Sequence, residues 1–418
     1  MSFLFAMIKL GLTNLWLHRL RSSLTALGKH DADYVDAYYG PEELKEEVEA
    51  SAWSISVVRE HGEALLLTLR SMTPDPGESP LTLRHAYLTR QTEALIARCR
   101  MLEGWSPAFD EESQALYDAV APSYGADHFE RLLNDISAAL PGGGSVAERY
   151  HTFIREFIIP RDKLDAVFTA AIQEGRKRSA LHIPLPAEES FTVEYVTGKS
   201  WSGYNWYKGG STSLIQMNVD FPITIDRAVD LACHEGYPGH HVYNSLLEKE
   251  LVRKRGWMEY SVYALFSPQS LIAEGTANFG IDMAFPGTER VRFEREVLYP
   301  LAGLDQGEAE RYASVQKLVQ RLAYAGNEAA RGYLNGVLSR EEAAHWLERY
   351  ALMSPDRALQ RTKFFDAYRS YVINYNLGQD LVQVFIESRG GTEDNPARRW
   401  EKFTDLLASP RLPSALGK

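Results

Sequence analysis

The sequence has few cysteines, no concentrated block of positive charge and no long apolar run. Only Cys99 and Cys233 occur among its 418 residues, which excludes a disulfide-rich scaffold and fits a reducing compartment. We therefore expect a cytoplasmic protein. Lysine and arginine number 45 against 56 aspartate and glutamate residues, giving a formal net charge of -11. This acidic balance argues against nucleic acid as a partner, because phosphate binding needs concentrated positive charge.

The N-terminal segment, residues 1–10, is apolar enough to suggest export or a membrane anchor. It has no positively charged region ahead of its apolar residues, and Lys9 lies within it, which is unlike a secretory signal peptide. It is also shorter than the roughly 18 apolar residues that a membrane-spanning helix needs. We interpret it as a helix that packs in the core, and we expect no membrane partner.

The rest of the composition is that of a globular protein, with 45% hydrophobic and 24% charged residues. Apolar residues recur every three or four positions from residue 10 to about 180, which predicts helices. Residues 191–196 and 211–219 instead alternate and are rich in β-branched and aromatic side chains, which predicts two strands. An aromatic and glycine-rich loop is expected between them at 201–210, and the pattern after Pro222 is helical again.

The predicted fold is therefore mainly α, a large helical protein with a small antiparallel β-sheet beside the candidate site. We divide the chain into an N-terminal helical region, residues 1–185, and a second region, residues 186–418, that carries the sheet and the site. The alternative is a single continuous domain.

The candidate site starts with residues 234–241, which read HEGYPGHH. Thr224 is a suitable N-cap and Asp226 suits a first helical turn, so the preceding residues predict a helix that carries His234 and Glu235. Imidazole and carboxylate groups are the natural ligands and bases of zinc hydrolases. A helix that presents His-Glu followed by another histidine is the zincin arrangement.

The spacing of the histidines departs from the HExxH pattern, because Pro238 stands where the second histidine should be. On a straight helix, His241 would return to the face of His234 about 10.5 Å along the axis, whereas His240 would point away. Proline removes a backbone donor and Gly239 permits unusual dihedrals, so we expect a bulge or kink there. Such a two-residue insertion would make His240 the second ligand, with His241 as the alternative.

A third ligand is expected on a second helix, for which Ser267 is the N-cap and Pro268 the first residue. Glu274 lies on this helix among apolar residues, which is costly for a carboxylate unless a cation compensates. A catalytic zinc usually has three protein ligands, so we expect Glu274 to complete the set with the two histidines. Asn278 and Asp282 follow one and two turns later, and either could orient a histidine ligand.

Residues 234–241 together with 274–277 (EGTA) resemble the paired motifs of the bacterial domain of unknown function 885 family, which belongs to the gluzincin-like zinc peptidase clan. Weaker similarity covers residues 34–41 (YVDAYYGP) and 375–378 (YNLG). The resemblance implies a mostly helical single-chain fold and a metal-dependent hydrolase of peptides.

These residues predict a zinc-dependent hydrolase, most simply a metallopeptidase acting on a peptide or small amide. Zinc lowers the pKa of a bound water to about 7, and Glu235 would accept the proton as general base. Tyr375 is the candidate for stabilising the oxyanion, with Tyr371 on the same helical face as the alternative. The strand at 214–219 could also add its edge to an extended substrate.

Two other functions stay open at this point. One is a zinc hydrolase of non-peptide amides or esters, because the same chemistry serves all of these substrates. The other is a non-catalytic metal-binding or peptide-binding protein.

Overall fold

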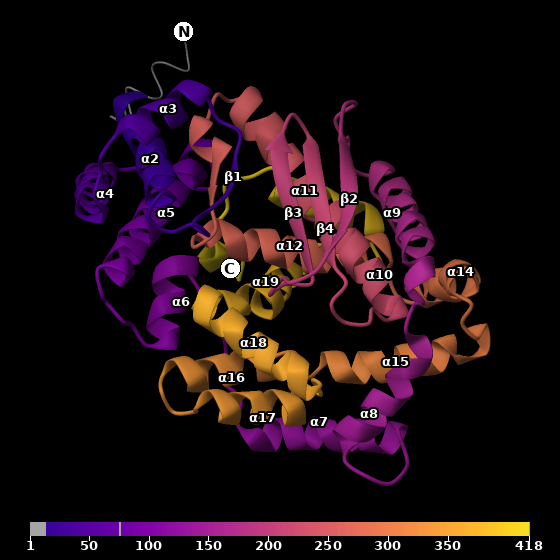
Figure 1. Cartoon of the computed structure of the whole chain (residues 1–418). Helices are drawn as coiled ribbons and strands as arrows, with labels where there is room; N and C mark the ends of the chain where they lie inside the picture. The colour runs from indigo at the N-terminus through magenta and orange to yellow at the C-terminus, as the bar shows by residue number, and fades with distance from the viewer. Residues whose placement is uncertain (1–13, 75–76, 418) are drawn as a thin grey trace.

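The computed structural model describes residues 14–74 and 77–417. Helices account for most of these residues, and the strands form two small sheets (Figure 1). The mainly α fold class is therefore confirmed. The apolar segment 1–10, interpreted as a core helix, lies outside the described residues. Among the helices that are described, none is long and apolar enough to cross a membrane.

Serine residues begin several of the N-terminal helices. The hydroxyls of Ser54 and Ser79 each accept a hydrogen bond from a backbone amide of the first turn, and Ser145 forms a capping box with Glu148. The helices of this half are α2 (Asn14–Leu27), α3 (Glu42–Ala50), α4 (Ile55–Arg70), α5 (Pro80–Leu102), α6 (Phe109–Tyr117), α7 (Ala126–Ala139), α8 (Val146–Ile154) and α9 (Leu164–Ala180).

A short strand, β1 (Val35–Tyr38), interrupts these helices where only helices were expected. It pairs antiparallel with β5 (Val262–Ala264), more than 200 residues later in the chain. The pairing ties the N-terminal helices to the region of the candidate site.

The larger sheet consists of β2 (Ser190–Val196), β3 (Gly203–Gly209) and β4 (Thr212–Asn218), in the order β2-β4-β3. The two predicted strands are confirmed as β2 and β4. The prediction of a loop at 201–210 was wrong over β3, which forms a hairpin with β4. Gly209 and Gly210 have φ angles of 80° and 63°, and this tight turn favours glycine.

The pairing within this sheet is mixed. Strand β3 is antiparallel to β4, as expected of a small antiparallel sheet, whereas β2 is parallel to it. The chain leaves β2, crosses to the far edge as β3 and returns through the centre as β4. Because β4 is bonded on both sides, the expectation that it offers a free edge to a substrate was wrong.

The C-terminal half is again helical, and most of its helices lie below the larger sheet in Figure 1. Its helices are α10 (Ile225–Leu231), α11 (His240–Leu247), α12 (Pro268–Ala284), α13 (Glu289–Phe293), α14 (Tyr299–Ala302), α15 (Ala309–Gln320), α16 (Ala325–Leu334), α17 (Arg340–Tyr350), α18 (Pro355–Tyr368), α19 (Ile373–Glu387) and α20 (Pro396–Leu407).

Two hydrophobic cores hold these elements together. The larger core packs residues such as Leu24 and Tyr87 against later ones such as Phe279. The second packs Phe168 of α9 against Val229 of α10 and other C-terminal residues. The regions 1–185 and 186–418 therefore share both cores.

Helices α12 and α19 cross in close contact near the centre of the molecule (Figure 1). A Cβ added to Gly275 on α12 would lie 2.4 Å from the backbone carbonyl carbon of Gly378 on α19, and one added to Gly378 would lie 2.8 Å from Leu271 O. Only glycine permits so close an approach of two backbones. The crossing places Glu274, the neighbour of Gly275, against the tyrosines that precede and begin α19.

Candidate metal centre

The two histidines of the candidate site lie on either side of a break between helices. Helix α10 continues through a π-helical turn, Ala232–Gly236, and α11 begins with His240 after three intervening residues. Only glycine fits at position 239, since a Cβ there would lie 1.9 Å from His234 O. The distortion expected in this segment thus takes the form of a break, which turns the His240 side chain back toward His234.

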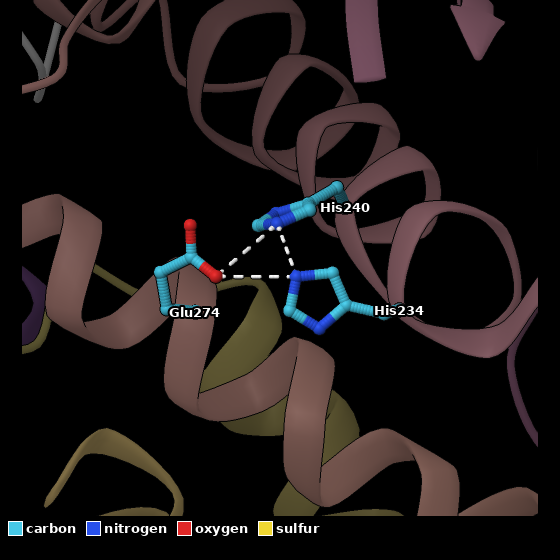
Figure 2. A group of neighbouring side chains, drawn as sticks. All are labelled: His234, His240 and Glu274. Atoms are coloured by element: carbon cyan, nitrogen blue, oxygen red, sulfur yellow. Dashed lines mark hydrogen bonds and ion pairs between the residues drawn. The ribbon is translucent and has the colours of Figure 1, made fainter. Parts of the chain in front are cut away.

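Three side-chain atoms converge beside this break (Figure 2). His234 Nε2 lies 3.1 Å from His240 Nε2 and 3.2 Å from Glu274 Oε2, and His240 Nε2 lies 3.6 Å from the same oxygen. Ligand atoms in a tetrahedral zinc site with bonds of about 2.0 Å lie about 3.3 Å apart. The spacing of the three atoms therefore suits a single zinc ion.

His241 points away from this cluster. Its Nδ1 lies 2.9 Å from Ser213 Oγ on β4, its Nε2 lies 3.1 Å from Glu189 Oε2, and the side chain is fully buried. These contacts anchor α11 to the sheet. Of the two histidines that the sequence left open, His240 is the one that the fold brings to His234 and Glu274.

Asn278, one turn after Glu274, orients His234. The Asn278 amide donates to the backbone oxygen of Tyr375 at 2.9 Å, so its Oδ1 faces His234 Nδ1, also at 2.9 Å. This hydrogen bond assigns the imidazole proton to Nδ1 and leaves Nε2 with a free electron pair for a metal. Asp282, the other candidate for this role, instead accepts a hydrogen bond from Gln379 at 3.3 Å.

The carboxylate of Glu274 is buried, and only one of its two oxygens accepts a hydrogen bond from a described residue. Tyr371 donates to Glu274 Oε1 at 2.7 Å, while Oε2 is buried and accepts no hydrogen bond. Burial raises the pKa of Glu274, but the two imidazoles outweigh burial and hold that pKa well below its usual range. Burial likewise lowers the pKa of His240, but Glu274 outweighs it and raises that pKa to about 9. Zinc prefers imidazole and carboxylate ligands, so these residues fit the ion.

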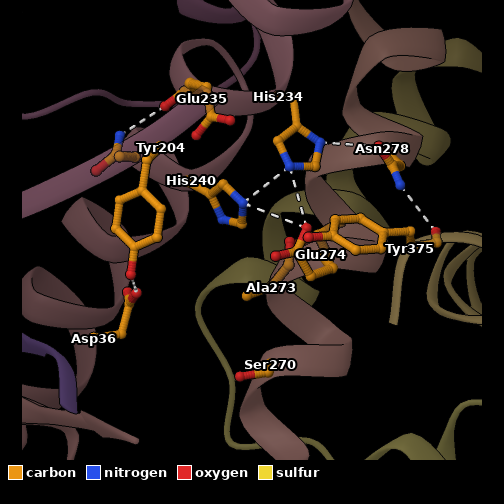
Figure 3. A network of polar contacts seen from close by, with 12 residues as sticks. Asp36, Tyr204, His234, Glu235, His240, Ser270, Ala273, Glu274, Asn278 and Tyr375 are labelled. Atoms are coloured by element: carbon orange, nitrogen blue, oxygen red, sulfur yellow. Dashed lines mark hydrogen bonds and ion pairs between the residues drawn. The ribbon is translucent and has the colours of Figure 1, made fainter. Parts of the chain in front are cut away.

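Glu235, on the π-helical turn after α10, is buried beside the cluster and faces β3 (Figure 3). Asn205 of β3 donates to its backbone oxygen at 2.7 Å. A Cβ added to Gly203 would lie 2.7 Å from Glu235 Oε1, so the glycine leaves room for the carboxylate. Burial raises the pKa of Glu235, and the neighbouring histidines oppose that effect. The carboxylate has no hydrogen bond to any residue that the structure describes, so its oxygens are free to accept one from a bound molecule.

The two candidate tyrosines differ in what their hydroxyls contact. The Tyr371 hydroxyl is used by Glu274. The Tyr375 ring centroid lies 6.4 Å from that of His234, and the side chain lines the same cavity. Within the described chain, no partner accepts or donates a hydrogen bond at the Tyr375 hydroxyl, so this group can serve a bound molecule. The geometry thus favours Tyr375 over Tyr371 for a contact with substrate.

A cavity of about 1010 Å³ opens onto the cluster. Strand β3 and helices α10 and α12 line it on one side and helices α7, α15 and α18 on the other, around the centre of Figure 1. Its wall includes Asp36 of β1, whose carboxylate accepts a short hydrogen bond from Tyr204 (Figure 3). Burial raises the pKa of Asp36 to about 6. Sequence reasoning offered Tyr204 as a residue that lines a substrate cleft or covers the core, but it assigned no role to Asp36, because only the β1–β5 pairing brings β1 to the site.

Comparison with known proteins identifies a similar fold but does not identify a function. No protein-family model matches the sequence, and no curated protein matches it. A solved structure, a putative lipoprotein from Colwellia psychrerythraea, superposes with a TM-score of 0.54 at 14% sequence identity, covering 87% of this chain and 68% of that one. At this identity the likeness concerns the fold alone. The resemblance to the domain of unknown function 885 family stays a prediction.

Proposed function

We propose that the protein is a zinc-dependent hydrolase of peptides. The observation that carries this proposal is the convergence of His234 Nε2, His240 Nε2 and Glu274 Oε2 within 3.6 Å of one another. A buried carboxylate, Glu235, stands next to this cluster, and both face a cavity of about 1010 Å³. Three protein ligands with an open side are what distinguishes catalytic zinc sites from structural ones.

His234, His240 and Glu274 would hold the ion, which when bound makes water more acidic and polarises a carbonyl. Glu235 accepts the proton from water and delivers it to the leaving amine as the bond to carbon breaks. Its raised pKa suits this exchange, because burial makes the carboxylate a stronger proton acceptor than an exposed one. Tyr375 donates a hydrogen bond from its hydroxyl to the developing oxyanion.

The cavity supports a peptide as substrate. Its volume lies at the upper end of the range of about 300–1,000 Å³ typical of ligand pockets. Its wall mixes aromatic side chains such as Trp201 and Tyr368 with polar ones such as Asn244 and Gln379. Such a surface can take up both the backbone and the side chains of several residues.

The test compares the wild-type protein with Glu235→Gln on a peptide library. The zinc-loaded wild type should cleave peptides, lose activity in chelator and regain it when zinc is restored. Glu235→Gln should keep its zinc, measured as metal content, and lose about 10²- to 10⁴-fold in kcat. The matched exchange Glu194→Gln, on the exposed side of β2, should leave kcat unchanged.

Three results would count against the proposal. Full activity of Glu235→Gln would refute the general base. Turnover of esters or small amides in preference to every peptide would establish the alternative substrate class. Zinc binding by a wild-type protein that hydrolyses none of these substrates would leave a metal-binding protein without catalysis.

A further inference from the structure

Arg361 faces the cavity and forms no ion pair with any described residue. It lies on α18, and with Phe364 and Tyr368, three and seven residues later, it forms the face of that helix that lines the cavity. Its guanidinium lies 4.2 Å from the ring centroid of Phe364 and 5.9 Å from that of Tyr375. Across residues 14–74 and 77–417, the structure contains no hydrogen bond or ion pair of this group.

A half-buried arginine without a carboxylate is costly. Arginine is stabilised away from water when its donors are paired, but the contacts of the Arg361 guanidinium within the described chain are with the aromatic rings of Phe364, Phe365 and Tyr375. Burial lowers the pKa of Arg361, and Tyr375 and Glu274 only partly oppose that effect. The five donors of the guanidinium are therefore available to an anion that enters the cavity.

Among the carboxylates on the cavity wall, only Glu235 has no hydrogen bond or ion pair to a described residue, and the others already have partners. Asp230 forms ion pairs with Arg227 and Arg290. Asp380 accepts a hydrogen bond from Tyr324, Asp36 accepts one from Tyr204, and Asp282 accepts one from Gln379. None of these carboxylates pairs with Arg361. Lys317 also lines the cavity without an ion pair to a described residue, but its ammonium is exposed and stabilised by water.

Arg361 lies close to the candidate metal ligands. Its guanidinium carbon is 5.9 Å from the Tyr375 ring centroid, which is 6.4 Å from that of His234. The distance from the Arg361 guanidinium carbon to the His234 ring centroid therefore cannot exceed the sum of these two distances. Since an extended residue spans about 3.6 Å at most, one to three residues would connect an anion at Arg361 with a carbonyl at the metal cluster.

We propose that Arg361 binds the C-terminal carboxylate of the peptide substrate, which makes the protein a carboxypeptidase that releases a short C-terminal fragment. This inference rests on the proposed function, because it places the cleaved bond at the metal cluster. The guanidinium presents two parallel donors that match a carboxylate. An acidic side chain near the cleaved bond has the same chemistry, and the experiment separates the two sources.

The experiment measures binding to chelator-treated protein, which does not depend on turnover. The first probe pair is acetyl-trialanine and its C-terminal amide. The second pair is the amidated peptide with glutamate or with glutamine as its last residue. Isothermal calorimetry is carried out on the wild type, Arg361→Met, Arg361→Lys and the control Arg357→Met. Arg357 lies one turn earlier on α18, stacks on Phe221 and does not line the cavity.

The wild type should bind acetyl-trialanine roughly 10- to 100-fold more tightly than its amide, as expected for a charge-assisted hydrogen-bonded pair. Arg361→Met should remove this preference, Arg361→Lys should keep part of it and Arg357→Met should keep all of it. A preference for the glutamate peptide only would replace the C-terminal carboxylate by an acidic side chain.

Equal binding of acid and amide within both pairs by the wild type would overturn the proposal, as would an unchanged preference in Arg361→Met. If Arg361→Met does not fold, the wild-type comparison and Arg361→Lys still decide. Carboxylate binding at Arg361 in a protein that never hydrolyses a peptide would refute the proposed function but not this site. Peptide hydrolysis by a protein that shows no preference for a carboxylate would refute the Arg361 site but not the proposed function.

Discussion

Replacing Glu274 by glutamine removes one charge from the candidate metal centre while preserving the shape of the side chain. Its Oε2 lies within 3.6 Å of both histidine nitrogens, so the carboxylate should be a direct zinc ligand. Loss of a group that merely orients a ligand costs about 10- to 100-fold in metal affinity. Loss of a direct ligand should cost at least about 100-fold.

The expected effect can be worked out as a zinc-induced gain in stability. At free zinc equal to about 100 times the wild-type Kd, binding stabilises the wild type by about 2.7 kcal/mol, whereas a 100-fold weaker variant gains about 0.4 kcal/mol. With an unfolding entropy of about 2.1 cal/mol/K per residue, 418 residues give a melting shift of about 3 °C for the wild type. Glu274→Gln should shift by less than 1 °C.

The assay is thermal unfolding of each protein in chelator and in a zinc buffer of fixed free concentration, combined with measurement of bound zinc. Because each protein is compared with itself, a change in the stability of the zinc-free protein does not enter the result. Asp282→Asn is the matched control: it changes a carboxylate on the same helix that lies outside the cluster, and its zinc shift should equal that of the wild type. A full zinc shift in Glu274→Gln, or none in the wild type, would refute the reasoning.

Three further predictions address the support of the site. Asn278→Ala should weaken zinc binding by about 10- to 100-fold, because His234 Nδ1 loses its hydrogen-bond partner. Competition with a chromophoric chelator measures the zinc affinity, and an unchanged affinity would show that this hydrogen bond does not matter. Gly275→Ala should lower the free energy of unfolding by about 1 to 3 kcal/mol, because the added Cβ would meet the Gly378 backbone. Urea denaturation measures this free energy. The control Gly326→Ala, on helix α16, should show no loss, because a Cβ there has open space. For Asp36, the folded pKa of about 6 exceeds the ordinary 3.8, so the neutral carboxyl stabilises the fold at low pH and this contribution is lost as pH rises through 6. In chelator, Asp36→Asn should therefore gain on the order of 2 kcal/mol relative to the wild type between pH 4 and pH 8, and a pH-independent difference in urea denaturation would contradict the assigned burial.

Local sequence determined the helical class and part of the candidate site. Apolar residues at helical spacing predicted the helices, because a helix must bury one continuous stripe wherever it packs. His234, Glu235 and Glu274 could be picked out because their residue types and neighbours are unusual for a helix interior. The flanking Pro238 and Gly239 also predicted a distortion, since both act on the backbone directly.

Tertiary structure decided what depends on partners far along the chain. The choice between His240 and His241 follows from which imidazole β4 and Glu189 bind, and no local pattern encodes that contact. Strand β1 forms only because β5 pairs with it, and β3 was mistaken for a loop because its aromatic residues and glycines gain their hydrogen bonds from β4. Arg361 belongs to the site because α18 forms one wall of the cavity. Sequence records the preference of each residue for its own backbone and solvent environment, whereas a cavity is defined by the surfaces of elements that meet only after folding.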